Sequence, residues 1–179
     1  ASAVAELFKS GLIPSACEYM EHSAVDAGSK QTSIPNPFPN AKAHLLLEVD
    51  GYSQVEIDRQ LEVLAEILER YGASEMALAD SPEHQSNFWR LRRSIGEAVK
   101  AKSIYKEEDT VVPRFELPTL LIEVKKICAQ YKVENICYGH AGDGNLHVNI
   151  LKGTLSQDAW DNELPRCITE IFSTVKRLG

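Results

Sequence analysis

The sequence predicts a single α+β domain in which helices cover one face of an antiparallel sheet. Segments with the apolar period of helices alternate along the chain with short segments typical of strands. Several of these strands are separated by tight-turn residues, as in hairpins, which favours antiparallel pairing over a doubly wound parallel sheet. The 179 residues are enough for one domain with its own hydrophobic core.

The first expected strand covers residues 44–50. Ser53 then begins a helix, because Glu56 lies three residues further on and completes a capping box. This helix ends at Gly72, since glycine readily adopts the left-handed conformation found after helix C-termini. The segment before the strand, residues 22–40, contains three prolines and several Ser and Asn residues, and is expected to be a long loop.

A short strand near residues 75–79 is expected next, followed by a helix from Pro82 to about residue 102. Ser81 is a favourable N-cap for this helix, and proline is favoured at the first helical position. The rest of the chain is expected to form a strand at residues 110–112 and a helix at 117–131. A two-stranded hairpin at 135–138 and 146–151 and a final helix at 159–178 are expected to follow.

Composition narrows the classes of function. The chain has 19 basic and 26 acidic residues and a net charge of −7, which argues against nucleic acid as its partner. No apolar run approaches the roughly 20 residues of a membrane helix. The four cysteines form no Cys-x-x-Cys pair, which indicates buried thiols in a reducing compartment. We therefore expect a cytoplasmic protein, with peripheral membrane association and a homodimer left open.

The stretch Tyr138–Asn149 carries the most specific chemical pattern. His140 and His147 flank a glycine-rich reversal, so a hairpin there would place two imidazoles within reach of one ion. A divalent metal such as zinc binds neutral imidazole and usually takes at least one more protein ligand. The alternative is that both histidines form local hydrogen bonds and the glycines only build the turn.

Arg92 is the second candidate, because it lies at the edge of the apolar stripe of helix 82–102. A guanidinium there needs an anionic partner, since burying it unpaired is costly. Its fork of donors suits a substrate carboxylate, but a structural pair with an acidic residue or a side chain that reaches water would also satisfy it. Lys106 could assist anion binding, although a solvated charge run is the default interpretation of its neighbourhood.

The stretch Gly139–Asn149, GHAGDGNLHVN, resembles the signature of the C-terminal domain of FAD-linked oxidases, the family of glycolate oxidase, D-lactate dehydrogenase and D-2-hydroxyglutarate dehydrogenase flavoproteins. Four other segments fit the family in order and extend the resemblance over nearly the whole chain: residues 11–20, 44–51, 88–100 and 108–113. The resemblance implies a ferredoxin-like α+β fold. It also implies that residues 1–179 are a substrate-binding cap domain whose partners are a small 2-hydroxy acid and an FAD-binding domain.

The resemblance further implies roles for individual residues. His140 and His147 match the catalytic pair of histidines that hold a divalent metal in metal-dependent members, and Asn149 matches a polar residue near substrate and flavin. Arg92 matches the arginine that grips the substrate carboxylate. Lys106 matches a substrate-binding lysine, with a spacing to the following proline that is one residue longer than in the family.

Two parts of the family pattern are not found in these residues. One is a Glu-His-Gly segment that supplies a third metal ligand and a candidate base, and the other is the domain that holds most of the FAD. We therefore expect the 179 residues to lack oxidoreductase activity when they are isolated.

The implied function is oxidation of a 2-hydroxy acid, of the D-lactate or glycolate type, to the 2-oxo acid by an FAD-dependent dehydrogenase or oxidase. A metal on His140 and His147 would lower the pKa of the substrate hydroxyl, whereas a metal-free variant would use one histidine as general base. Two alternatives belong to other classes. A non-catalytic domain would bind an anionic ligand through Arg92, and a metallohydrolase would need a third ligand that the remaining histidines do not offer by spacing.

Overall fold

The computed structural model describes residues 1–179 and contains six α-helices and an open, five-stranded antiparallel sheet. The strand order across the sheet is β2-β1-β4-β5-β3. The strands are β1 (Ala16–Glu21), β2 (Ala43–Glu48), β3 (Tyr105–Val111), β4 (Glu134–His140) and β5 (Asn145–Leu151). The helices are α1 (Ser2–Lys9), α2 (His22–Thr32), α3 (Gln54–Arg70), α4 (Pro82–Lys100), α5 (Leu117–Gln130) and α6 (Gln157–Leu178). The expected α+β class with an antiparallel sheet is confirmed.

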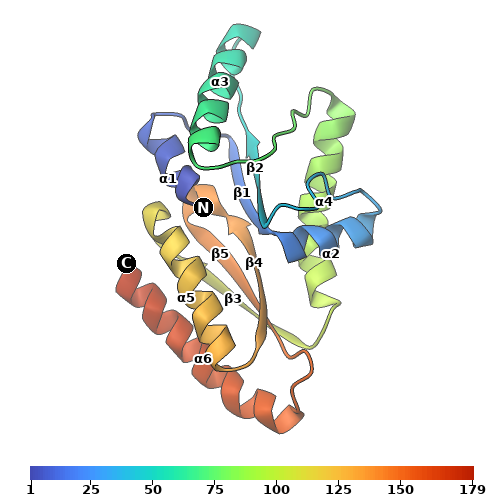
Figure 1. Cartoon of the computed structure of the whole chain (residues 1–179), viewed down its shortest axis with the longest axis vertical. Helices are drawn as coiled ribbons and strands as arrows, with labels where there is room; N and C mark the ends of the chain where they lie inside the picture. Colours follow the sequence, from blue (N-terminus) through green and yellow to red (C-terminus); the bar gives the residue numbers. More distant parts are fainter.

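The alternation of side chains along the strands gives the sheet two apolar faces. On one face, Cys137 and Val148 belong to a core of 19 buried residues built with α5 and α6. On the other face, Ile136 and Tyr138 belong to a core of nine buried residues built with α2 and α4. Figure 1 shows these two pairs of helices on opposite sides of the sheet. The sequence predicted helices on one face only, and the structure has a pair of helices on each face.

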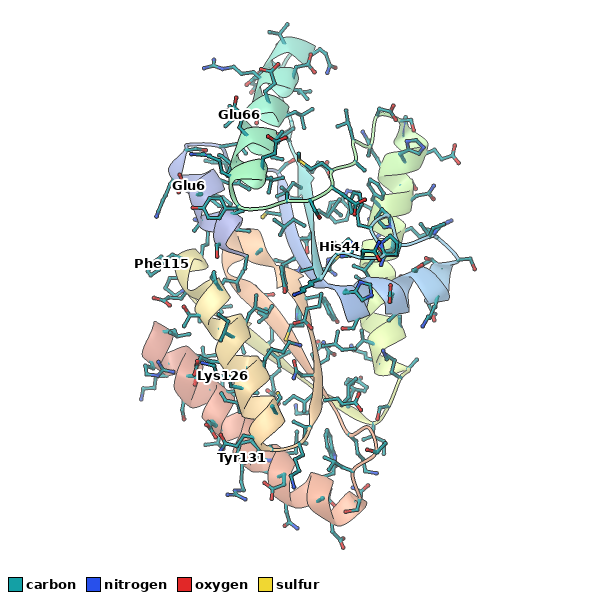
Figure 2. The ribbon with its side chains drawn as sticks, in the orientation of Figure 1. Glu6, His44, Glu66, Phe115, Lys126 and Tyr131 are labelled. Carbon is teal, nitrogen blue, oxygen red and sulfur yellow. The ribbon has the colours of Figure 1, made fainter.

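The side chains drawn in Figure 2 follow the same layers. Figure 2 shows Lys126 of α5 and Tyr131, which follows the last residue of α5, on the α5–α6 side of the sheet, and His44 on the opposite side, beside α2. A third and smaller core lies between α1 and α3, where six buried residues pack against partly buried leucines of β2. This arrangement leaves α3 projecting from one end of the sheet (Figure 1).

The expected hairpin is confirmed, and it joins β4 to β5 at the centre of the sheet. The two strands pair with Tyr138 opposite His147 and are connected by a single turn of 3-10 helix, Ala141–Asp143. Glycine is required at both ends of this turn. A Cβ on Gly139 would lie 2.5 Å from the carbonyl oxygen of Asn145, and one on Gly144 would collide with backbone of the segment that follows β3.

Two of the sequence expectations are wrong. Residues 22–40 do not form one long loop, because 22–32 are helix α2. This helix packs closely on α4 through Gly28, where a Cβ would lie only 3.1 Å from the carbonyl oxygen of Leu91. Its polar composition and single valine conceal that contact. Residues 75–79 are not a strand, because the chain there is exposed and pairs with no other strand.

The chain also contains elements that were not expected and confirms several that were. Helix α1 and strand β1 were not foreseen, and β3 begins five residues before the expected start. Ser53 and Ser81 cap α3 and α4 with their hydroxyl oxygens, as expected. All four cysteines are free and buried, which confirms the expectation of buried thiols. No helix has both the length and the apolar character to cross a membrane.

Substitution of Gly144 by alanine tests whether the hairpin turn is sterically fixed. Gly144 (φ 73°) and Gly72 (φ 80°) have nearly the same backbone conformation, but only Gly144 lacks room for a Cβ. We expect Gly72→Ala to lower the free energy of unfolding by about 1 kcal/mol, the cost of left-handed backbone alone. We expect Gly144→Ala to cost about 2 kcal/mol more, because of the collision. Urea denaturation measures both, and equal losses would contradict a steric requirement at the turn.

Candidate functional site

A row of polar side chains crosses four strands of the sheet, on the face that packs against α2 and α4. The row follows from the register. Glu18 of β1 lies opposite His140 of β4, and His147 of β5 lies between Tyr138 of β4 and Asp109 of β3. Residues that lie opposite each other in antiparallel strands project from the same face. Segments far apart in the sequence therefore meet here without any loop having to reach across.

The two histidines face each other as the sequence predicts. Their ring centroids are 5.7 Å apart and their planes are nearly perpendicular. Nδ1 of His140 lies 2.8 Å from Oε1 of Glu18, and Nδ1 of His147 lies 3.4 Å from Oδ1 of Asp109. Neither Nε2 atom has a protein partner. Nδ1 of His140 is thus hydrogen-bonded to a carboxylate, whereas Nδ1 of His147 is only near one and makes no hydrogen bond.

The environment of His147 keeps its imidazole neutral. Burial lowers the pKa of His147 from 6.5, and the nearby carboxylates of Asp109 and Glu107 only partly oppose that effect. Near pH 7 the ring therefore carries one proton and one lone pair. A neutral imidazole of this kind can accept a proton or bind a metal ion.

Arg92 reaches the same face from α4 and contacts Glu18. Its Nε and Nη2 donate to Oε2 of Glu18 at 2.9 and 2.6 Å, and the two side chains are only 10% and 8% exposed. Its guanidinium also lies over the Tyr138 ring, 5.2 Å from the centroid. The structural ion pair that the sequence left open is thus present. It occupies one edge of the guanidinium, and Nη1 remains without a partner.

Asn149 lies on the same face of β5, two residues beyond His147. The residue is fully buried, and neither its amide oxygen nor its amide nitrogen makes a hydrogen bond of normal geometry. A buried amide without partners is costly, so such groups call for a particular explanation. A role in binding another molecule is one such explanation.

The structure does not bring Lys106 to this cluster. Lys106 pairs opposite Ile150, whose side chain is part of the α5–α6 core, and its Nζ lies 3.4 Å from Glu108. A shift of one residue along a strand reverses the face, so Lys106 projects away from the histidines. The lysine on the histidine side is Lys100 of α4, whose Nζ lies 3.5 Å from Oε2 of Glu107.

Sequence reasoning missed the carboxylate at the centre of the site. Glu18 carries the contacts of both Arg92 and His140, but it was considered only as part of a resemblance. The available signal was a single acidic residue between Cys17 and Tyr19, in a strand whose other members are nearly all buried. An ionisable side chain in such a stretch is expected to be paired.

The donor set fits a divalent cation only in part. Two neutral imidazole nitrogens suit zinc, and a carboxylate behind each Nδ1 is the usual outer support of a metal-binding histidine. No group of three or more His, Cys, Asp or Glu side chains is arranged to hold a metal. A separate cavity lies away from the histidines. A cavity of about 510 Å³ lies between α2 and α4 and is lined by other residues, including His22, Asp26 and Lys102.

The chain is thus an α+β domain whose open antiparallel sheet presents an arginine and two histidines on one face. Residues 1–179 match the family described as FAD linked oxidases, C-terminal domain, and the chain belongs to that family.

Curated relatives match nearly the whole chain. The glycolate oxidase subunit GlcD of Bacillus subtilis is 28% identical over 180 residues, which is 100% of this chain and 38% of that protein. A D-lactate dehydrogenase of Anaerostipes hadrus is 26% identical over 98% of this chain, and a D-2-hydroxyglutarate dehydrogenase of Stutzerimonas stutzeri is 27% identical over 97% of it. The chain spans about 38% of the length of these relatives.

A double-mutant cycle tests whether Arg92 and Glu18 depend on each other. We expect Arg92→Met to lower the free energy of unfolding by about 3–5 kcal/mol, because it leaves a buried carboxylate without its cation. The double variant Arg92→Met/Glu18→Gln should cost less than the sum of the two single variants. Arg166→Met is the control, because its pair with Glu163 is exposed and should be worth less than about 1 kcal/mol. Equal losses for Arg92→Met and Arg166→Met would contradict the buried pair.

Proposed function

We propose that this chain is the substrate-facing domain of an FAD-dependent dehydrogenase or oxidase that converts a 2-hydroxy acid, of the D-lactate or glycolate type, to the 2-oxo acid. Membership of the FAD-linked oxidase family supports the flavin and the class of reaction. The observation that carries the substrate class is that Arg92 and His140 share one carboxylate, Glu18, while His147 lies beside His140. A 2-hydroxy acid has a carboxylate and a hydroxyl on adjacent carbons, and this face offers a partner for each.

Arg92 binds the substrate carboxylate in this proposal. Its Nε edge is held by Glu18, so the guanidinium is fixed in orientation before substrate arrives. The N–H groups on the Nη1 side then donate to the substrate carboxylate, in the fixed plane of the guanidinium. Fixing the acid in this way also fixes its hydroxyl carbon relative to the histidines, and positioning of this kind supplies a large share of enzymatic rate.

His140 and His147 act on the substrate hydroxyl. Both present Nε2 without a protein partner, and the lowered pKa of His147 keeps that ring neutral near pH 7, with one nitrogen unprotonated. An unprotonated Nε2 can take the hydroxyl proton as the C–H bond of the same carbon breaks. The hydride that leaves the carbon needs an acceptor, and bound FAD supplies it.

A divalent metal such as zinc would be held by the Nε2 atoms of His140 and His147, with its further ligands supplied from outside the described residues. When bound, it supplies a Lewis acid that lowers the pKa of the substrate hydroxyl. The carboxylates of Glu18 and Asp109 behind the two Nδ1 atoms support both this role and the metal-free role of the histidines.

The rest of the site is assigned to an FAD-binding domain that covers the histidine face. His140 is 50% exposed on this chain, so water reaches it freely. A covering domain would exclude that water and bring the flavin to the substrate. It would also bring a hydrogen-bonding partner to Asn149, whose buried amide makes no hydrogen bond of normal geometry here.

Reduction of the flavin in the longer flavoprotein tests the proposed function. D-lactate, glycolate and D-2-hydroxyglutarate are each mixed anaerobically with the protein, and bleaching of the flavin absorbance is recorded. We expect at least one of them to bleach the flavin. His140→Ala and His147→Ala should slow bleaching by about 10²-fold or more, the usual contribution of a positioned proton acceptor. His84→Ala is the control, because His84 is an exposed residue of α4.

Other outcomes have separate meanings. Bleaching lost on treatment with a chelator and restored by zinc would assign the metal to the histidine pair. Retention of full bleaching in both histidine variants would contradict the proposed roles of these residues. Binding of a 2-hydroxy acid without any bleaching would support a non-catalytic anion-binding domain instead.

Replacement of Arg92 by lysine tests carboxylate binding separately. Lysine keeps the charge beside Glu18 but lacks the planar fork, so we expect KM for the 2-hydroxy acid to rise by about 10- to 100-fold. Arg93→Lys is a matched control on the same helix, because Arg93 is exposed and lies over Trp89. Steady-state kinetics give both values, and an unchanged KM in Arg92→Lys would rule out the carboxylate role.

A further inference from the structure

Glu18 contacts both the guanidinium of Arg92 and the imidazole of His140. Its side chain projects from β1 and the residue is only 6% exposed. The two carboxylate oxygens are divided between the partners: Oε2 accepts from Arg92, and Oε1 lies 2.8 Å from Nδ1 of His140. The partners come from α4 and β4, so a single carboxylate links three elements of the fold.

The contact with Glu18 decides which nitrogen of His140 carries the proton. A carboxylate that faces a guanidinium has only acceptor atoms, so the nitrogen that contacts it must donate. That nitrogen is Nδ1. In the neutral ring Nε2 then keeps the lone pair, on the atom that has no protein partner. Without Glu18 nothing else on this chain hydrogen-bonds to the His140 ring, and the tautomer would be left unspecified.

The second histidine, His147, has a nearby carboxylate but no hydrogen bond to it. Asp109 lies opposite His147 in the strand register, but the nitrogen and oxygen are 3.4 Å apart and Asp109 is 66% exposed. Oδ1 of Asp109 also accepts from Nδ2 of Asn145 at 2.7 Å. The buried and shorter contact at Glu18 is therefore the stronger constraint of the two.

We propose that Glu18 is a positioning residue that fixes the His140 tautomer with Nε2 unprotonated and at the same time fixes the orientation of Arg92. The consequence for catalysis rests on the proposed function, because a lone pair on Nε2 is useful only if that atom meets a hydroxyl or a metal ion. One carboxylate then sets the relative positions of the group that binds the acid and the group that acts on the hydroxyl. The tautomer itself is a property of this chain and needs no flavin.

The substitution Glu18→Gln tests the proposal by a change of tautomer. Glutamine keeps the shape but has one acceptor and one donor end. The charged Arg92 takes the amide oxygen, so the amide NH₂ group turns to His140 and requires Nδ1 to accept. We expect His140 to switch from the Nδ1–H form to the Nε2–H form. Two-bond ¹H–¹⁵N correlation spectra of the 179-residue chain at pH 8 distinguish the two forms by their nitrogen shifts.

Glu21→Gln is the matched control. Glu21 is on the same strand, is also buried, and pairs with a cation, Lys125 of α5, on the opposite face of the sheet. It should cost stability without changing the His140 spectrum. The Nε–H resonance of Arg92 provides a second measurement, because Glu18→Ala should make this proton exchange faster with water, whereas Glu21→Gln should leave it unchanged.

Each result has one interpretation. An Nε2–H form of His140 in the unaltered chain, or an unchanged tautomer in Glu18→Gln, would overturn the positioning role. Circular dichroism establishes whether Glu18→Gln is folded, and if it is not, the spectrum of the unaltered chain still decides the tautomer. Failure of the longer protein to reduce flavin, with the Nδ1–H form observed here, would overturn the proposed function and leave the role of Glu18 intact.

Discussion

The whole arrangement depends on the strict alternation of side chains through the β4–β5 hairpin. The hairpin forms the middle of the sheet, with β1 on one flank and β3 on the other. Every second residue of β5 faces α5 and α6 and is apolar: Leu146, Val148 and Ile150. The intervening residues of the hairpin face α4 and include both histidines and Asn149. The same alternation that builds the larger core therefore delivers the polar side chains to one face.

Burial on that face gives the polar contacts their strength and also their cost. Arg92 and Glu18 are separated by 74 residues and are nearly buried. Their ion pair therefore connects α4 to β1 beside the core that the sheet forms with α2 and α4. A charge removed from such a pair leaves its partner stranded in a medium of low dielectric. An ion pair on the molecular surface, such as that of Arg166 with Glu163, would neither hold its side chains in one orientation nor exclude the water that weakens it. The interior location suits a site in which donors must be fixed before a ligand arrives.

Sequence reasoning identified the elements whose signals are local. Ser53 and Ser81 cap their helices because capping depends on a few adjacent residues, and the glycine-rich reversal between His140 and His147 specifies its own hairpin. Helix α2 was missed because its stability comes from close contact with α4 at Gly28, which is a tertiary effect. Lys106 was placed in the candidate site by the family resemblance, although the pairing of β3 with β5 turns it to the other face. Glu18 was missed because its partners lie 74 and 122 residues away and nothing near it in sequence points to them.

In the proposed function, the histidine face of the sheet binds a 2-hydroxy acid between Arg92 and the two imidazoles. A crystal structure of the longer flavoprotein with a 2-hydroxy acid and reduced flavin tests this binding most directly. We expect the carboxylate on the Nη1 side of Arg92 and the hydroxyl oxygen toward the Nε2 atoms of His140 and His147. A substrate that contacts neither Arg92 nor the histidines, or that lies in the cavity between α2 and α4, would contradict it.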